Sequence, residues 1–253
     1  MATITGNWLG NTSPLSALQN FNLEQTVSNT TSLYNSLETE FWNGNFYYRS
    51  TSDSFISATT FSGYSLSLSG SGFLGSLPTL TAVSLSGFGN TVSLRGNLSY
   101  TSSGNFLGGS VSSVYATLGS SSFSISGNYQ LNSSGDITSA NFSAISAGNG
   151  IYNVSMSGAF TYSANNIFGT ISSLSLSDTS GNNISLSGLG LAFDGNLNGD
   201  YLGHLSDASI LSGTDTINVN FSEGLIANGY AGNDTITGGV GADTLIGGAG
   251  ADT

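Results

Sequence analysis

The chain has 253 residues, which is enough for one large domain or two ordinary ones, and it carries a net charge of −12 at pH 7. It contains two arginines and no lysine, and this scarcity of cations excludes nucleic acid and anionic membrane surfaces as partners. Its 36 glycines, together with abundant Ser, Thr and Asn, favour strands and turns over helices.

The N-terminal residues 1–45 are predicted to form a cap with one short helix. Leu33, Leu37 and Phe41 follow one another at four-residue spacing, and Thr31 or Ser32 can cap the helix start. Such a helix would cover the open edge of a sheet. The first ten residues lack the basic and apolar regions of a secretory signal, and no apolar run is long enough to span a bilayer. We therefore expect no membrane insertion and export by a route without an N-terminal signal.

Residues 46–193 are self-similar and are predicted to form a β-strand repeat domain. Three units of about thirty residues align, at 90–119, 121–150 and 151–181. Within each unit a glycine follows the first apolar pair, at Gly96, Gly127 and Gly158, and Gly188 continues the series. Gly70 and Gly87 suggest an earlier, more degenerate unit.

Each unit indicates two strands joined by a tight turn. Apolar and polar residues alternate along 123–131, which is the pattern of a half-buried strand. The segments 101–105, 132–136 and 178–182 carry Ser-Ser-Gly or Thr-Ser-Gly, which suits hairpin turns. An antiparallel sheet is the predicted fold, with a β-solenoid of two strands per coil as the alternative.

The second strand of each unit interrupts this alternation at one place. Apolar residues stand three apart at Val111 and Val114, at Ile137 and Ala140, and at Ile171 and Leu174. Residues three apart cannot face the same side of a regular strand, so an extra residue is expected there. Bulges repeated at one level would bend the sheet in one direction.

The C-terminal segment 194–253 holds eight of the 14 acidic residues and ends in three consecutive nonapeptides. Asp234, Asp243 and Asp252 occupy the same position in these nonapeptides, and Ile236 and Leu245 share another. The pattern resembles the RTX, or hemolysin-type, calcium-binding repeat of secreted bacterial proteins. Glycine permits the tight turn, and the aspartate supplies a hard oxygen ligand.

The resemblance implies the start of a parallel β-roll that binds Ca²⁺. Each ion would lie between one turn and the turn two repeats later, which pairs Gly229–Asp234 with Gly247–Asp252. The turn Gly238–Asp243 is expected to lack a partner turn. Asp215 looks like part of a degenerate copy, but its spacing of nineteen residues from Asp234 breaks the eighteen-residue register. The predicted metal-binding residues are Gly229, Ala231, Asp234, Gly238, Val240, Asp243, Gly247, Ala249 and Asp252.

Catalytic patterns are weak in this chain, and we expect no enzymatic activity. His204 is the single histidine, and nucleophilic or zinc chemistry needs partners at defined spacing. The resemblance implies type I secretion to the cell exterior or surface. The last repeat stops one residue before its apolar position, so either further repeats and a C-terminal secretion signal follow Thr253 or the sequence is truncated. The predicted function is a calcium-binding structural protein that assembles head to tail with itself, or with cell-surface and matrix components, as a filament, biofilm matrix or adhesin.

Two alternatives remain open. Outward-facing Ser and Thr arrays could make the chain an ice- or carbohydrate-binding module. RTX repeats also occur on larger secreted enzymes, so the chain could be the non-catalytic part of one.

Overall fold

The computed structural model describes residues 1–9, 46–60, 63–75, 77–101, 103, 105–163, 166–193, 211–222, 224 and 226–253. The described part consists of strands and turns, and no helix in it could cross a membrane. The short helix predicted around Leu33–Phe41 is not borne out, because it falls outside the described residues and the described part contains no helix. The domain boundaries predicted at residues 45 and 193 also stay predictions.

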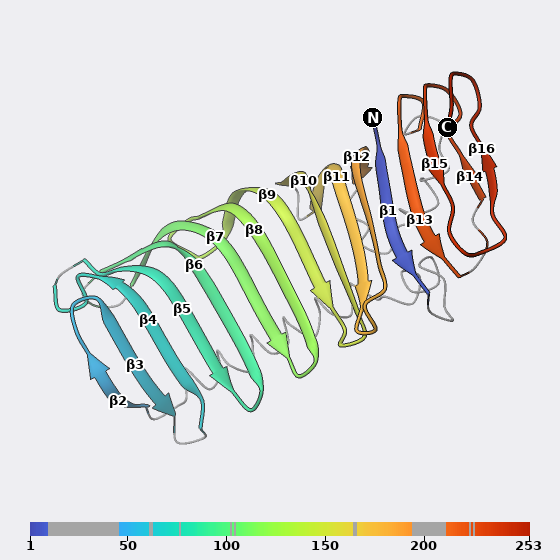
Figure 1. Ribbon diagram of the computed structural model, residues 1–253. Coiled ribbons are helices and arrows are strands. Elements are labelled where there is room, and N and C mark those ends of the chain that lie inside the picture. Colours follow the sequence, from blue (N-terminus) through green and yellow to red (C-terminus); the bar gives the residue numbers. More distant parts are fainter. Residues whose placement is uncertain are drawn as a thin grey trace. The chain divides into compact units, whose positions relative to one another are not determined.

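The chain divides into two compact units. Unit 1 comprises residues 1–24, 148–160 and 167–253, and unit 2 comprises residues 25–147 and 161–166. The strands of unit 2 are β2 (Phe46–Thr51), β3 (Phe55–Thr60), β4 (Ser65–Ser71), β5 (Thr79–Gly87), β6 (Asn90–Tyr100), β7 (Phe106–Leu118), β8 (Ser121–Leu131) and β9 (Ile137–Gly148). They follow one another in space in chain order, and all the pairs from β2 to β8 are antiparallel. The antiparallel meander is therefore confirmed over the parallel solenoid (Figure 1).

Unit 1 combines antiparallel and parallel pairing. Its strands are β1 (Thr3–Trp8), β10 (Tyr152–Ser163), β11 (Asn166–Asp178), β12 (Asn183–Phe193), β13 (Thr216–Phe221), β14 (Ile226–Asn228), β15 (Thr235–Thr237) and β16 (Thr244–Ile246). One sheet runs in the order β15-β13-β1-β12-β11-β10, and β14 pairs with β16 separately. The pairs β1–β13, β13–β15 and β14–β16 are parallel, so the predicted parallel roll is present.

The predicted irregularity is present in both units, and in each unit it lies at one level of the strands. The register shifts between Val111 and Ser113 in β7 and between Ile171 and Ser173 in β11. From β4 to β8, each strand carries one more residue at this level than the strand before it. Extra residues that accumulate in one direction bend the sheet, as the curved strands of Figure 1 show. The bulge expected at Ile137–Ala140 stays a prediction.

The repeated glycines lie at this same level and have a steric reason. A Cβ atom at Gly96 or Gly127 would overlap the carbonyl oxygen of Ser110 or Asn141 on the next strand, and Gly158 faces Thr170 in the same way. Neighbouring backbones approach so closely at the bend that only glycine fits. The glycine period seen in the sequence thus reflects the same close backbone approach, which recurs from one strand pair to another within unit 2 and again in unit 1.

Strand β1 is the largest departure from the prediction, because residues 1–45 were expected to cap the sheet rather than join it. β1 lies between β12, its antiparallel partner, and β13, its parallel partner (Figure 1). Ile4 and Trp8 are buried on the same face of β1, and the ring of Trp8 stacks on Tyr152 with centroids 6.5 Å apart. Two alternating apolar residues in a six-residue strand are too weak a signal to predict this insertion.

Both ends of β1 are held by polar side chains. At its end, Leu9 N–H donates to Asn182 Oδ1 at 2.9 Å, and Asn182 Nδ2 in turn donates to Asp178 Oδ2 at 2.7 Å. Partial desolvation raises the pKa of Asp178, but hydrogen bonds from Asn182, Ser180 and Gly181 outweigh it and lower that pKa. At its start, Ala2 N–H donates to Asp215 Oδ1. Asp215, which directly precedes β13, therefore also holds the start of β1.

Candidate metal centre

The C-terminal strands form two short parallel ladders joined by turns. Ile217 in β13 pairs with Ile236 in β15, and Ala227 in β14 pairs with Leu245 in β16. Ala227, Ile236 and Leu245 follow at intervals of nine residues, whereas Ile217 precedes Ala227 by ten. The extra residue that disturbs the repeat register therefore lies between β13 and β14, and the stacking of the strands is maintained across it.

The first and third predicted turns are brought together at one edge of the roll. Ala231 and Ala249 form a parallel bridge, and Gly232 N–H donates to Ala249 C=O at 2.9 Å. Asp234 N–H donates to Asp252 Oδ1 at 3.0 Å. The turns Gly229–Asp234 and Gly247–Asp252 are thus stacked directly on one another, as the eighteen-residue pairing requires.

The second predicted turn, Gly238–Asp243, connects the end of β15 to the start of β16. It therefore lies at the edge of the roll opposite to the first and third turns. Val240 N–H donates to Asn220 Oδ1 at 3.2 Å, and a Cβ at Gly224 would overlap the carbonyl oxygen of Ala242. The expectation that Gly238–Asp243 has no partner turn is therefore wrong. The turn lies against Asn220 in β13 and against Gly224, a part of the chain that does not match the nonapeptide pattern, so this contact was not predicted.

The first glycine of each nonapeptide makes room for the aspartate of the same nonapeptide. A Cβ at Gly229 would overlap Oδ2 of Asp234, and the same relation joins Gly238 to Asp243 and Gly247 to Asp252. The carboxylate is therefore folded back over the first glycine of its own turn. Glycine at this position is needed for space as well as for turn conformation.

Two of the aspartates are deeply buried and incompletely satisfied. Asp215 and Asp234 are 1% and 2% exposed, and the Oδ2 atom of each has no hydrogen-bond partner among the described residues. The amino group of Met1, 4.0 Å from Asp215 Oδ1, balances part of the charge of Asp215, whereas Asp234 has no ion-pair partner among the described residues. Burying a carboxylate whose charge is not balanced costs roughly several kcal/mol, so a bound cation or a proton is favoured there. Asp215 was not among the predicted ligands. The signal that could have found it was the triplet Asp215-Thr216-Ile217, which repeats as Asp234-Thr235-Ile236.

The donor set fits a calcium ion. Among the described residues no three His, Cys, Asp or Glu side chains converge, so a metal would take most of its ligands from backbone carbonyls. Carboxylate and carbonyl oxygens on a flexible turn are what Ca²⁺ prefers. Asp234 and Asp252 would hold the ion together with carbonyls of their turns, and the ion would neutralise carboxylates that otherwise repel one another. The same donors exclude metals that prefer nitrogen or sulfur.

Comparisons with known proteins agree with this description for the C-terminal segment. No curated protein and no solved structure matches the chain. RTX repeats are typical of proteins exported by type I secretion, which is consistent with an extracellular location. Residues 226–253 match the family model of the RTX calcium-binding nonapeptide repeat (4 copies), and this segment of the chain is therefore an RTX calcium-binding segment.

Proposed function

We propose that the protein is a secreted calcium-binding structural protein that assembles with copies of itself at the cell surface or in the extracellular matrix, and that it has no catalytic role. The RTX segment supports calcium binding and export. The observation that carries the assembly step is the outer edge of β2. This strand ends the strand order of the sheet, and within the described residues it pairs with β3 alone.

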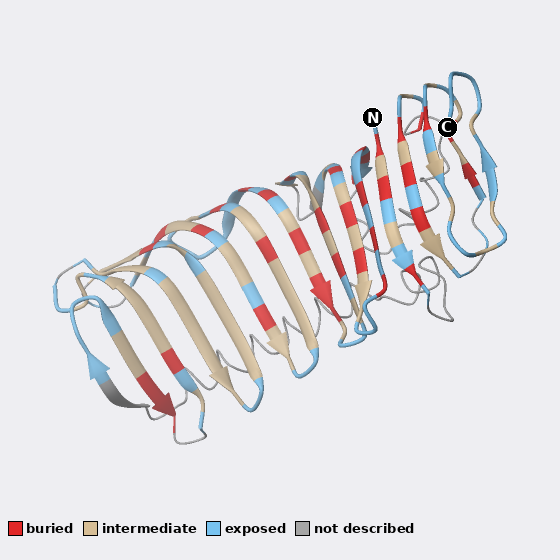
Figure 2. Ribbon diagram, in the orientation of Figure 1, coloured by how far each residue is buried: buried red, intermediate tan, exposed pale blue. Residues whose placement is uncertain are grey.

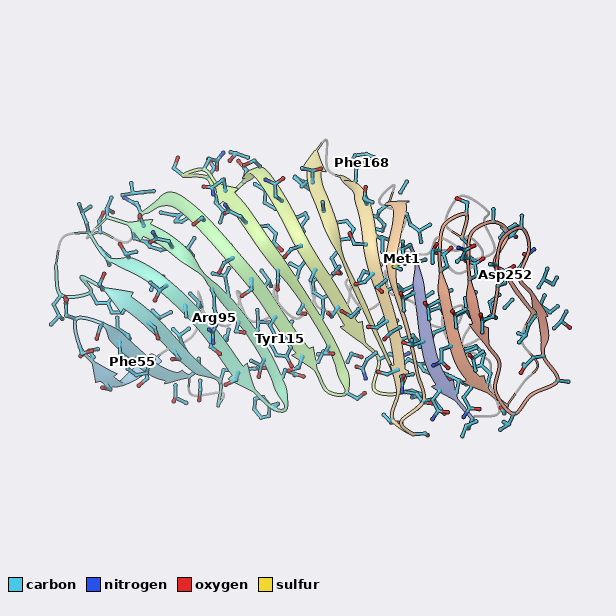
Figure 3. All side chains as sticks on the ribbon, turned by 45° about the horizontal axis from the view of Figure 1, so that its top comes forward. Met1, Phe55, Arg95, Tyr115, Phe168 and Asp252 are labelled. Carbon is cyan, nitrogen blue, oxygen red and sulfur yellow. The ribbon has the colours of Figure 1, made fainter. Side chains whose placement is uncertain are left out.

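The sheet behind β2 lacks the usual protection against edge pairing. Strands β2–β9 contain two charged residues, Arg49 in β2 and Arg95 in β6 (labelled in Figure 3), and they contain no lysine and no proline. Monomeric β proteins normally place lysines, prolines or inward-pointing charges along such edges. Ser50 and Thr51 near the end of β2 are both exposed. An additional strand can therefore pair with β2 by backbone hydrogen bonds.

An interface in which one edge strand of a subunit pairs with a different edge strand of a second copy is heterologous. If it does not close into a ring, it extends into a filament. The bulges give the sheet a defined twist. A strand of an added subunit would therefore pair with the edge strand in one register, whereas a flat edge would allow several registers. Association is therefore expected to yield ordered fibres in place of amorphous aggregates.

Placing two lysines on the edge should prevent assembly. In the variant Ser50→Lys/Thr51→Lys, the edge strand carries two lysines in addition to Arg49, and an incoming strand would have to desolvate them. We expect the wild-type protein in calcium to form species larger than a monomer at micromolar concentration, and the variant to stay monomeric. Multi-angle light scattering and negative-stain microscopy measure both.

The control is Ser133→Lys/Ser134→Lys, which adds the same charge to an exposed hairpin turn between β8 and β9. It should assemble like the wild type. A wild-type protein that is strictly monomeric and forms no fibres would contradict the assembly proposal. Glycan-array and ice-recrystallisation assays would then test the alternative of an ice- or carbohydrate-binding module.

A further inference from the structure

The turn that ends at Asp215 lies outside the matched residues 226–253, yet its backbone makes the same contacts as the matched turns. Asp215 N–H donates to Asp234 Oδ1 at 2.9 Å, just as Asp234 N–H donates to Asp252 Oδ1 at 3.0 Å. Thr235 N–H donates to Asp215 C=O at 3.0 Å, and Thr253 N–H donates to Asp234 C=O at 2.8 Å. Each aspartate is thus joined to the next through its N–H and its C=O.

The glycines of these turns show the same level-by-level stacking. A Cβ at Gly250 would overlap the carbonyl oxygen of Gly232, and a Cβ at Gly232 would overlap the carbonyl oxygen of Gly213. The turns ending at Asp215, Asp234 and Asp252 are therefore three successive levels of one stack. The turn ending at Asp215 does not fit the nonapeptide spacing, because Asp215 is nineteen rather than eighteen residues before Asp234. The extra residue lies between β13 and β14, outside the turn itself.

The side chain of Asp215 has the property that a cation site requires. Its Oδ1 atom accepts the N–H of Ala2, and the amino group of Met1 lies 4.0 Å from the same oxygen. Its Oδ2 atom is buried and has no partner among the described residues, and the same holds for Oδ2 of Asp234. Two carboxylates at neighbouring levels thus each keep one buried oxygen unsatisfied. A shared divalent cation would satisfy both and remove their repulsion.

We propose that Asp215 and Asp234 bind a calcium ion in addition to the one held by Asp234 and Asp252, between the turns that end at these two residues. Asp234 then contributes to two ions, one on each side of its turn. The inference rests on the proposed calcium-binding function and extends it to a level that the repeat pattern does not include.

The stack of turns ends at Ala2, directly before β1. The added ion would therefore affect how firmly β1 is held in the sheet of unit 1. Ala2 occupies the place of the aspartate at a fourth level, since its N–H donates to Asp215 Oδ1 and its C=O accepts Thr216 N–H at 3.1 Å. Thr3 and Ile4 then pair with Thr216 and Ile217. Figure 3 shows Met1 and Asp252 at the same end of these strands. Calcium at Asp215 would therefore hold β1 in the sheet.

Counting bound ions on the full chain tests the proposal. Asp215→Asn keeps an oxygen that can accept the Ala2 N–H but removes the charge. By equilibrium dialysis with ⁴⁵Ca²⁺, we expect this variant to bind one calcium ion per chain fewer than the wild type. Asp252→Asn should also lose one ion, at the other position, and Asp136→Asn, in the exposed turn between β8 and β9, should lose none.

An Asp215→Asn variant that binds as many ions as the wild type, with the same dissociation constants, would overturn the additional position while leaving calcium binding by the RTX segment intact. A wild-type chain that binds no calcium would overturn the proposed function itself.

A second measurement needs no variant. In the ¹⁵N-labelled wild type, the amide resonance of Ala2 should shift as calcium is added, because its acceptor carboxylate becomes a metal ligand. A resonance that stays unchanged at saturating calcium would also refute the proposal, even if the variant failed to fold.

Discussion

Replacing Asp234 and Asp252 together by alanine should abolish the ordering of the roll by calcium. Without the ion, the carboxylates of the stacked turns repel one another, and a glycine-rich turn loses more conformational entropy on folding than most sequences do. At a calcium concentration 100 times the dissociation constant, binding stabilises the ordered state by about 2.7 kcal/mol. Amide exchange in residues 226–253 of the wild type should therefore slow by roughly 100-fold, and in the double variant it should not change. Hydrogen exchange followed by mass spectrometry measures both.

Unit 2 provides the internal control for this experiment. Among the described residues, the strands β3–β8 pair with one another, so chelation with EDTA should leave amide exchange in β3–β8 unchanged. The matched variant Asp136→Ala should respond to calcium like the wild type. Calcium-dependent slowing that persists in the Asp234→Ala/Asp252→Ala chain would show that these residues are not the ligands. Loss of protection throughout β3–β8 on chelation would make calcium a global requirement.

Introducing one methyl group at Gly127 should strongly destabilise unit 2. In Gly127→Ala, the new Cβ overlaps the carbonyl oxygen of Asn141 and lies 2.6 Å from the Cα of Phe142, so backbone rather than a flexible side chain must move. Overpacking of this kind typically lowers the free energy of unfolding by about 3 kcal/mol or less, and a clash with backbone belongs at the upper end. Urea denaturation followed by circular dichroism measures the change.

Gly75→Ala is the matched control. The nearest atom to a Cβ at Gly75 is the carbonyl oxygen of Gly72 at 3.4 Å, which is ordinary contact. This variant should unfold within about 0.5 kcal/mol of the wild type, as surface substitutions usually do. If both variants showed equal stability, the close approach of β8 and β9 at Gly127 would not be a constraint, and the repeated glycines would need another explanation.

Much of the fold was predictable because its determinants are local. Alternation predicted half-buried strands, and the Ser-Ser-Gly and Thr-Ser-Gly turns predicted their antiparallel pairing. The apolar residues three apart predicted the bulges at Val111–Val114 and Ile171–Leu174. The in-phase aspartates predicted the calcium roll and the stacking of its first and third turns. Figure 2 shows that burial follows the same alternation in β12 and β13. These features arise from the two-residue period of strands and the nine-residue period of the coil.

Only the tertiary structure showed that β1 lies beside β13 and which residues contact the turn Gly238–Asp243. The sequence triplet Ala2-Thr3-Ile4 resembles Asp234-Thr235-Ile236, but the likeness has meaning only once β1 is placed beside β13, more than two hundred residues away in the chain. The contacts of the turn Gly238–Asp243 and the ligand role inferred for Asp215 depend on the same stacking. An inserted residue changes the spacing between equivalent positions in the sequence, while backbone hydrogen bonds keep the successive levels aligned in space. A search for a regular spacing therefore misses levels that are separated by an insertion. The sequence by itself thus determined the strands, the bends and the calcium repeat, whereas long-range pairing decided where the calcium stack begins.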